Sequence, residues 1–147
     1  MKVAEILRER GNHVVTVSAD RTLPEAIRTL VDRNIGSLLV TDADGRVAGL
    51  ITERDILREF DRRAGAIDGV RVAEVMKENP PTATPDDDLV QLRATMTERR
   101  VRHLPIVRGE ELVGLVSLGD LVKVLHQAAE VENRHLKDYI SGKYLEG

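Results

Sequence analysis

The sequence predicts a mixed α/β protein of the α+β type, built from two tandem copies of one β-α-β-β-α unit. One observation is a repeated pentapeptide, because residues 3–7 (VAEIL) return as residues 72–76 (VAEVM). A second is a repeated heptapeptide, because residues 49–55 (GLITERD) return as residues 114–120 (GLVSLGD). Segments that recur in the same order along a chain indicate a duplicated structural unit.

Each copy is expected to open with a short strand followed by a helix. The strand covers residues 14–17 in the first copy and 82–84 in the second, where β-branched residues are frequent. From Leu23, apolar residues follow three and four positions apart, which predicts an amphipathic helix. Thr22 and Glu25 form a capping-box pattern at the start of this helix.

Two more strands and a second helix complete each copy. The first copy carries strands at 35–41 and 47–52, joined by an Asp44-Gly45 turn that is typical of a hairpin. A helix then starts after Thr52, and its predicted apolar face consists of Ile56, Leu57 and Phe60. The matching segments of the second copy are strands at 101–108 and 112–117 and a helix that starts after Ser117, with Leu121, Val122 and Leu125 on its predicted apolar face.

The two copies are expected to depend on each other for stability. A unit of roughly 60 residues buries too little surface to be more than marginally stable alone. We therefore expect the copies to pack around a pseudo-two-fold axis, with a cleft lined by equivalent residues of both. The predicted boundaries are 1–66 for the first copy, 67–126 for the second and 127–147 for a helical C-terminal tail.

The composition argues against several classes of partner. A formal net charge of -3 gives no overall field that attracts nucleic acid or an anionic membrane, so neither is expected as a partner. Phe60, Tyr139 and Tyr144 are the only aromatic residues, too few for a base-stacking platform. The chain has no cysteine and its first ten residues are too charged for a signal peptide, so we expect a cytoplasmic location.

No motif for catalysis or metal binding stands out. The four histidines lack the spacing of zinc ligands. The acids around Gly45 do not form a calcium loop, because that glycine comes fourth from Asp42 where such a loop needs it sixth. The chain contains neither a Gly-x-Ser-x-Gly sequence nor a phosphate-binding P-loop. We therefore expect no metal, no catalytic cofactor and no enzymatic activity.

The order of elements and the doubled motif Gly-x-[Ile/Val]-[Thr/Ser]-x-x-Asp resemble the CBS domain, and two such domains in tandem resemble a Bateman module. The resemblance extends from Val3 to about His126. It implies an adenosine-containing ligand between the paired repeats, with AMP as the leading candidate and ADP, ATP, NAD or S-adenosylmethionine as others. It also implies a homodimer and a separate effector protein that reads the ligand state in trans.

The resemblance further implies which residues contact the ligand. Asp55 and Asp120 would accept hydrogen bonds from ribose hydroxyls, and Thr52 and Ser117 would contact ribose or phosphate. Arg54 would supply a cation at the start of the helix, where the second copy has Gly119 instead. The remaining predicted ligand-binding residues come from the first and second strands of each copy: Thr16, Val17, Ile35, Gly36, Ser37, Thr82, Ala83, Arg102, His103, Leu104 and Pro105. Because the two copies differ at these positions, the two sites are expected to differ in affinity.

Plainer interpretations stay open beside this one. Thr52 with Asp55, and Ser117 with Asp120, are also the residue types that cap a helix without any ligand. Arg99 and Arg100, which shortly precede Arg102, are expected to belong to a solvated helix end. A scaffold for dimerisation or docking that binds no physiological nucleotide is therefore the alternative function, and nucleotide hydrolysis is a third class for which we expect no product.

Overall fold

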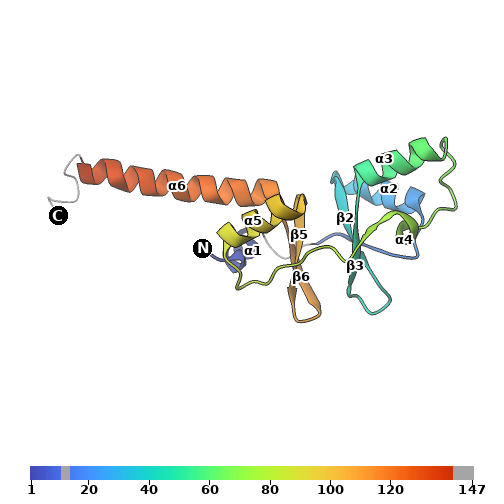
Figure 1. The fold of residues 1–147 in the computed structure, drawn as a ribbon, viewed down its shortest axis with the longest axis horizontal. Coiled ribbons are helices and arrows are strands. Elements are labelled where there is room, and N and C mark those ends of the chain that lie inside the picture. The colour runs from blue at the N-terminus through green and yellow to red at the C-terminus, as the bar shows by residue number, and fades with distance from the viewer. Residues whose placement is uncertain (11–13, 141–147) are drawn as a thin grey trace.

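The computed structural model describes residues 1–10 and 14–140, which form two lobes joined side by side (Figure 1). The first lobe contains seven elements: β1 (Thr16–Ser18), α2 (Leu23–Arg33), β2 (Ser37–Thr41), β3 (Val47–Thr52), α3 (Glu53–Arg62), α4 (Val72–Val75) and β4 (Lys77–Glu78). The second lobe contains five: α1 (Val3–Arg10), α5 (Leu89–Arg99), β5 (His103–Arg108), β6 (Glu111–Ser117) and α6 (Leu118–Ile140). The part of the predicted tail from 141 to 147 lies outside the described residues.

The first lobe holds a four-stranded sheet in the order β1-β2-β3-β4. β1 runs parallel to β2, whereas β2 and β3 form the predicted antiparallel hairpin. Its turn contains Gly45 at φ 79°, a left-handed conformation that glycine adopts without steric cost. The hairpin register places Ser37, at the start of β2, opposite Thr52, at the end of β3. Two residues predicted to bind ligand are thereby paired at one end of the hairpin.

The second lobe repeats this hairpin but not the complete sheet. β5 and β6 pair in the same way, with His103 opposite Ser117. The strand predicted at 82–84 is wrong: only Ala83 bridges to the sheet, donating to the Pro105 carbonyl oxygen at 3.0 Å and accepting from the Val107 amide at 2.8 Å. Prolines at 80, 81 and 85 explain the difference, because they lack the N–H groups that a longer ladder needs.

The two repeats exchange their N-terminal helices, which the sequence did not predict. Val3, Ile6 and Leu7 of α1 are buried in the core of the second lobe, beside α5, β6 and α6. In return, Val72 of α4 is fully buried in the core of the first lobe, against β3 and α3. Each repeated pentapeptide therefore packs on the other repeat, and this exchange joins the two lobes.

The second helix of each repeat is less buried than its sequence pattern predicts. Ile56 of α3 is buried, but Leu57 is 66% exposed and Phe60 is 50% exposed. In α6, Leu121 is fully buried while Val122 is 48% exposed. The described residues therefore leave apolar side chains exposed to solvent on each lobe.

Candidate functional site

A cleft of about 220 Å³ lies between the two repeats. Its first-repeat wall consists of Val14 and Val15, just before β1, and of the segment from Ile35 to Ser37 at the start of β2. Its second-repeat wall consists of His103 at the start of β5 and Leu115 and Ser117 on β6. Aliphatic side chains, one imidazole and two hydroxyl groups therefore meet at the point where the two hairpins face each other.

A basic groove of about 610 Å³ adjoins this cleft, because His103 and Ser117 line both. Its other lining residues are Arg102 and several residues along the first turns of α6: Leu118, Gly119, Val122, Lys123 and His126. The amide groups at the start of a helix have no partner within the helix, and the helix dipole favours an anion there. The groove therefore combines basic side chains with a helix N-terminus, a chemistry suited to phosphate.

Lys123 and His126 are site candidates that sequence reasoning missed. Both follow Gly119 at helical spacing, four and seven positions on, and this periodicity was the signal available to find them. His126 is partly engaged, since its Nε2 lies 3.1 Å from Glu130 Oε1. An anion in the groove would compete with Glu130 for this imidazole.

The two hydroxyl-and-acid motifs both form capping boxes. In α3, the Asp55 amide donates to Thr52 Oγ1 at 3.2 Å and the Thr52 amide donates to Asp55 Oδ2 at 3.0 Å. In α6, the Asp120 amide donates to Ser117 Oγ at 3.1 Å and the Ser117 amide donates to Asp120 Oδ2 at 3.0 Å. The plainer interpretation, that these residues cap the two helices, is therefore correct. A carboxylate has further acceptor capacity, so capping does not exclude a ligand.

The surroundings of the two motifs nevertheless differ. Asp55 is only 9% exposed, and Lys77 Nζ lies 3.9 Å from its Oδ1. Ser117 lines both the cleft and the basic groove, whereas Thr52 lines neither. Of the two motifs, only the one in the second repeat contributes residues to the cleft and the basic groove.

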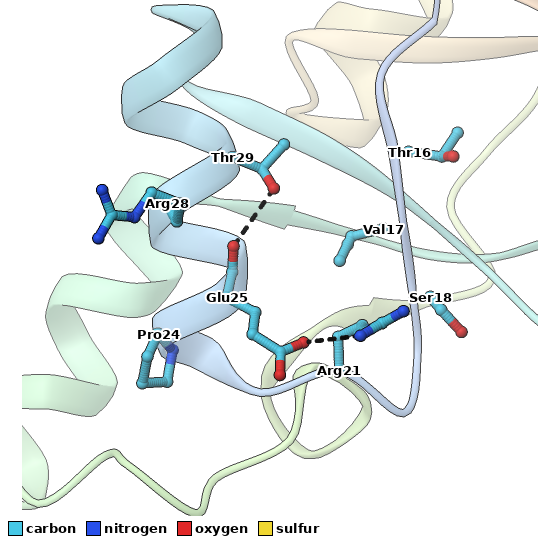
Figure 2. A pocket seen from close by; sticks show the side chains of 8 residues that line it. All are labelled: Thr16, Val17, Ser18, Arg21, Pro24, Glu25, Arg28 and Thr29. Atoms are coloured by element: carbon cyan, nitrogen blue, oxygen red, sulfur yellow. Dashed lines mark hydrogen bonds and ion pairs between the residues drawn. The ribbon is translucent and has the colours of Figure 1, made fainter.

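A third cavity of about 670 Å³ lies between β1 and the first turns of α2 (Figure 2). Thr16 and Val17, both predicted to bind ligand, line this cavity and not the cleft. Most polar groups around it are already paired: Arg21 Nη1 lies 3.4 Å from Glu25 Oε2, and Ser18 Oγ donates to Asp20 at 2.7 Å. That hydrogen bond from Ser18 is the main cause that holds the pKa of Asp20 below its usual range. These pairs stabilise the turn between β1 and α2 and leave little for a ligand.

The structure brings together seven of the predicted residues around the cleft and the basic groove: Ile35, Gly36, Ser37, Arg102, His103, Ser117 and Gly119. Eight others line none of these three cavities: Thr52, Arg54, Asp55, Thr82, Ala83, Leu104, Pro105 and Asp120. Leu104 and Ala83 are core residues, 0% and 5% exposed, which accounts for their distance from any opening. Arg54 is exposed on α3.

The described residues offer neither a cluster of metal ligands nor a membrane-spanning helix. In residues 1–10 and 14–140, no group of three or more histidine, aspartate or glutamate side chains is placed to hold a metal ion. None of the helices in this part of the chain is both long enough and apolar enough to cross a bilayer.

Comparison with known proteins shows which family has this architecture. The CBS domain family model matches twice, at residues 3–62 and 72–127. The CBS domain-containing protein CBSX3, mitochondrial, of Arabidopsis thaliana is 29% identical over 97% of this chain and 73% of its own length. The crystal structure of the CBS-domain containing protein ATU1752 from Agrobacterium tumefaciens is 37% identical with a TM-score of 0.78, covering 83% of this chain and 91% of that one.

Two more distant crystal structures share the fold and contain ligands. CBSX2 in complex with AMP has a TM-score of 0.70, and the CBS domain pair of protein MJ0100 in complex with 5'-methylthioadenosine and S-adenosyl-L-methionine has one of 0.76. Each is 23% identical and covers 87% of this chain and 98% of its own, so each supports the fold alone. With two matched copies that span most of its length, the chain belongs to the CBS domain family.

Proposed function

We propose that this chain is a regulatory module that binds an adenosine-containing ligand, with AMP as the leading candidate, in the cleft between its repeats. The observation that carries the proposal is the continuity of the cleft with the basic groove through His103 and Ser117. The cleft offers an aliphatic environment of the kind a purine base needs when no aromatic residue is present. The groove offers cations and a helix N-terminus for phosphate.

The proposed pose assigns each part of the ligand to one wall. The base lies against Val14, Val15 and Ile35, and the ribose meets Ser37 and Ser117. The phosphate lies in the groove, near Arg102 and the first turn of α6. ADP, ATP, NAD and S-adenosylmethionine share the adenosine part, and the two ligand-bound structures of similar fold contain adenosine compounds.

The pose also predicts that one site dominates. The Ser117 motif opens onto the cleft and the groove, whereas Asp55 is nearly buried and lies close to Lys77. We therefore propose one high-affinity site per chain. The ligand acts by binding, without catalysis, and an effector in trans reads the result. Such a signal requires the ligand to prefer one arrangement of the repeats or of a homodimer.

Calorimetric titration with AMP, ADP, ATP, NAD and S-adenosylmethionine tests the proposal. We expect saturable binding of at least one of them. Arg102→Ala should weaken that binding by roughly tenfold or more, because a hydrogen bond to a charged group contributes about 1.5–3 kcal/mol. Arg99→Ala is the matched control, since Arg99 is an exposed basic residue outside both cavities. Equal losses in the two variants would contradict the pose.

The capping boxes favour a second candidate function. Because both carboxylates already accept backbone hydrogen bonds, the motifs are fully explained by helix capping. A scaffold that binds no nucleotide would then be sufficient. No heat from any ligand of the panel, together with no ligand-dependent shift in Tm, would favour the scaffold. The cytoplasmic location expected from the cysteine-free sequence stays a prediction under either function.

A further inference from the structure

The basic groove continues along α6 beyond the place of a first phosphate. His103 and Ser117 join it to the cleft, and Arg102 directly precedes His103. From the first turn of α6, its lining extends to Lys123 and His126. His126 comes nine residues after Ser117, a rise of about 13 Å along an α-helix. The groove, at about 610 Å³, also exceeds the cleft of about 220 Å³, so it has room for more than one phosphate.

The distal part of the groove offers donors and no acid. Lys123 has an ammonium group with three donors and forms no ion pair within residues 1–10 and 14–140. His126 adds an imidazole one turn further along the same helix. No aspartate or glutamate is among the described residues that line the groove. An anionic group beside Lys123 would therefore gain a charge-assisted hydrogen bond without repulsion from the lining.

The first repeat lacks this chemistry at the equivalent place. Gly36 stands at the position of Arg102, and Asp61 stands at the position of His126. Two basic side chains are thus replaced by a glycine and an acid. Both repeats form the same hairpin and the same capped helix, so the fold does not require the basic side chains of the second repeat. They indicate a part of the ligand that only the second repeat contacts.

We propose that Lys123 and His126 form a subsite for a second phosphate, so that adenosine compounds with two or more phosphates bind more tightly than AMP. The subsite rests on the proposed function and narrows its ligand class. The base and ribose lie in the cleft, the first phosphate lies near Arg102, and the second lies beside Lys123. AMP fills the cleft and the first part of the groove only, whereas ADP, ATP and NAD also reach the subsite.

Glu130 competes with the second phosphate for His126. Its Oε1 lies 3.1 Å from His126 Nε2, and the two side chains are 59% and 71% exposed. An exposed ion pair of this kind contributes little stability, so a phosphate is able to displace the carboxylate. Lys123 has no such competitor among the described residues, and it should therefore supply the larger share of the preference.

Calorimetric titration with AMP and with ADP tests the subsite, because the two ligands differ only by the second phosphate. The buffer contains little salt and no divalent cation, so that the phosphates keep their charge and are weakly screened. We expect the full-length wild-type chain to bind ADP at least about tenfold more tightly than AMP, as one charge-assisted hydrogen bond allows. Lys123→Ala should weaken ADP binding several-fold more than AMP binding. Lys123→Arg should retain the preference, because it keeps a cation at this position.

Lys137→Ala is the matched control. Lys137 is an exposed lysine of α6 that comes fourteen residues after Lys123, about four turns further on and on nearly the same face. It lies outside the groove, so its loss should change neither affinity. Glu130→Gln should act in the opposite direction to Lys123→Ala and strengthen ADP binding more than AMP binding, because it removes the competing charge.

Two results would overturn the subsite and leave the adenosine site in place. One is equal affinity of the wild-type chain for AMP and ADP. The other is an equal loss of AMP and ADP binding in Lys123→Ala, because Lys123 would then contact the first phosphate. If neither nucleotide binds, the proposed function fails and the subsite fails with it.

Discussion

Leu7 of α1 packs directly on Gly114 of β6, so that a Cβ at Gly114 would lie 2.5 Å from Leu7 Cδ2. The reciprocal contact joins Met76, which follows α4, to Gly49 of β3, where a Cβ would lie 2.6 Å from the methionine sulfur. The last residue of each repeated pentapeptide thus rests on the first residue of the other repeat's heptapeptide. Both glycines of the doubled motif are accounted for by this exchange of helices, whether or not a ligand binds.

Gly114→Ala should destabilise the protein by about 1–3 kcal/mol, the usual cost of overpacking a core. All three atoms nearest to the added methyl group belong to the Leu7 side chain. In a Leu7→Ala background, which creates space at the same place, the additional cost of Gly114→Ala should fall close to zero. Urea unfolding of the four proteins measures this coupling. Gly69→Ala, where nothing lies within 4 Å, is the control and should be neutral or slightly stabilising.

Gly49→Ala should behave differently although it occupies the equivalent position. Besides Met76, the Lys77 carbonyl oxygen would lie 2.7 Å from the added Cβ, because β4 pairs with β3 there. A side chain can be shortened by mutation, but a backbone carbonyl group in a sheet stays in place. Met76→Ala should therefore fail to rescue Gly49→Ala in the same unfolding experiment. If Met76→Ala fully restored the stability of Gly49→Ala, the backbone of β4 would have to move easily to make room for the added methyl group.

Ser117→Ala and Thr52→Ala form a matched pair that separates capping from ligand binding. The hydroxyl groups accept from the Asp120 and Asp55 amides at 3.1 and 3.2 Å, so each variant should lose about 0.5–2 kcal/mol of stability. Only Ser117 lines the cleft, so only Ser117→Ala should also weaken AMP binding in calorimetry. Weaker binding in both variants, or in neither, would contradict a single site at Ser117.

The sequence was sufficient for features that depend on neighbouring residues. The hairpin at Asp44-Gly45, the helix that starts after Thr52 and the cap at Thr22 follow from local turn and capping chemistry, and the structure has all three. The repeat pattern predicted the family in the same way, because both copies retain the motif residues in order.

The sequence was insufficient where long-range packing decides. The similarity of residues 3–7 to 72–76 is the same whether each pentapeptide packs on its own repeat or on the other one. The strand predicted at 82–84 is reduced to a bridge between Ala83 and Ile106, and the spacing of β-branched residues could not show how far its pairing with the hairpin would extend. Lys123 and His126 follow Gly119 at helical spacing, but that spacing does not show that Arg102 and His103 line the same groove.

Glu59 of α3 should give the protein a small stability term that depends on pH. Its carboxylate accepts hydrogen bonds from Arg62 and, at 2.6 Å, from Arg63 Nε, and these hold the pKa of Glu59 below its usual range. A lowered pKa in the folded chain means that the stabilisation is present above the unfolded value of about 4.3 and is lost as pH falls through the lower folded value. The stability difference between wild type and Glu59→Gln should therefore be present at neutral pH and vanish under acid conditions.

Urea unfolding from neutral pH down to about pH 3 measures the Glu59 difference. Added salt should reduce it, because the pair is close to solvent. Glu98→Gln is the control, since Glu98 is an exposed acid of α5 outside the described ion pairs. A difference that grows as the pH falls would mean that the pKa is shifted in the other direction.

The exchange of helices predicts which fragment of the chain keeps the first core. Ile67, Val70 and Val72 are buried in that core, yet all three come after residue 66. A fragment of residues 14–78 retains them, whereas a fragment of residues 1–66 loses them and carries α1 without its partners in the second lobe. Far-UV circular dichroism and urea titration should therefore show a cooperative transition for 14–78 and none for 1–66. If the fragment 1–66 unfolds as cooperatively as 14–78, then α4 contributes little to the first core and the two repeats fold as they are ordered in the sequence.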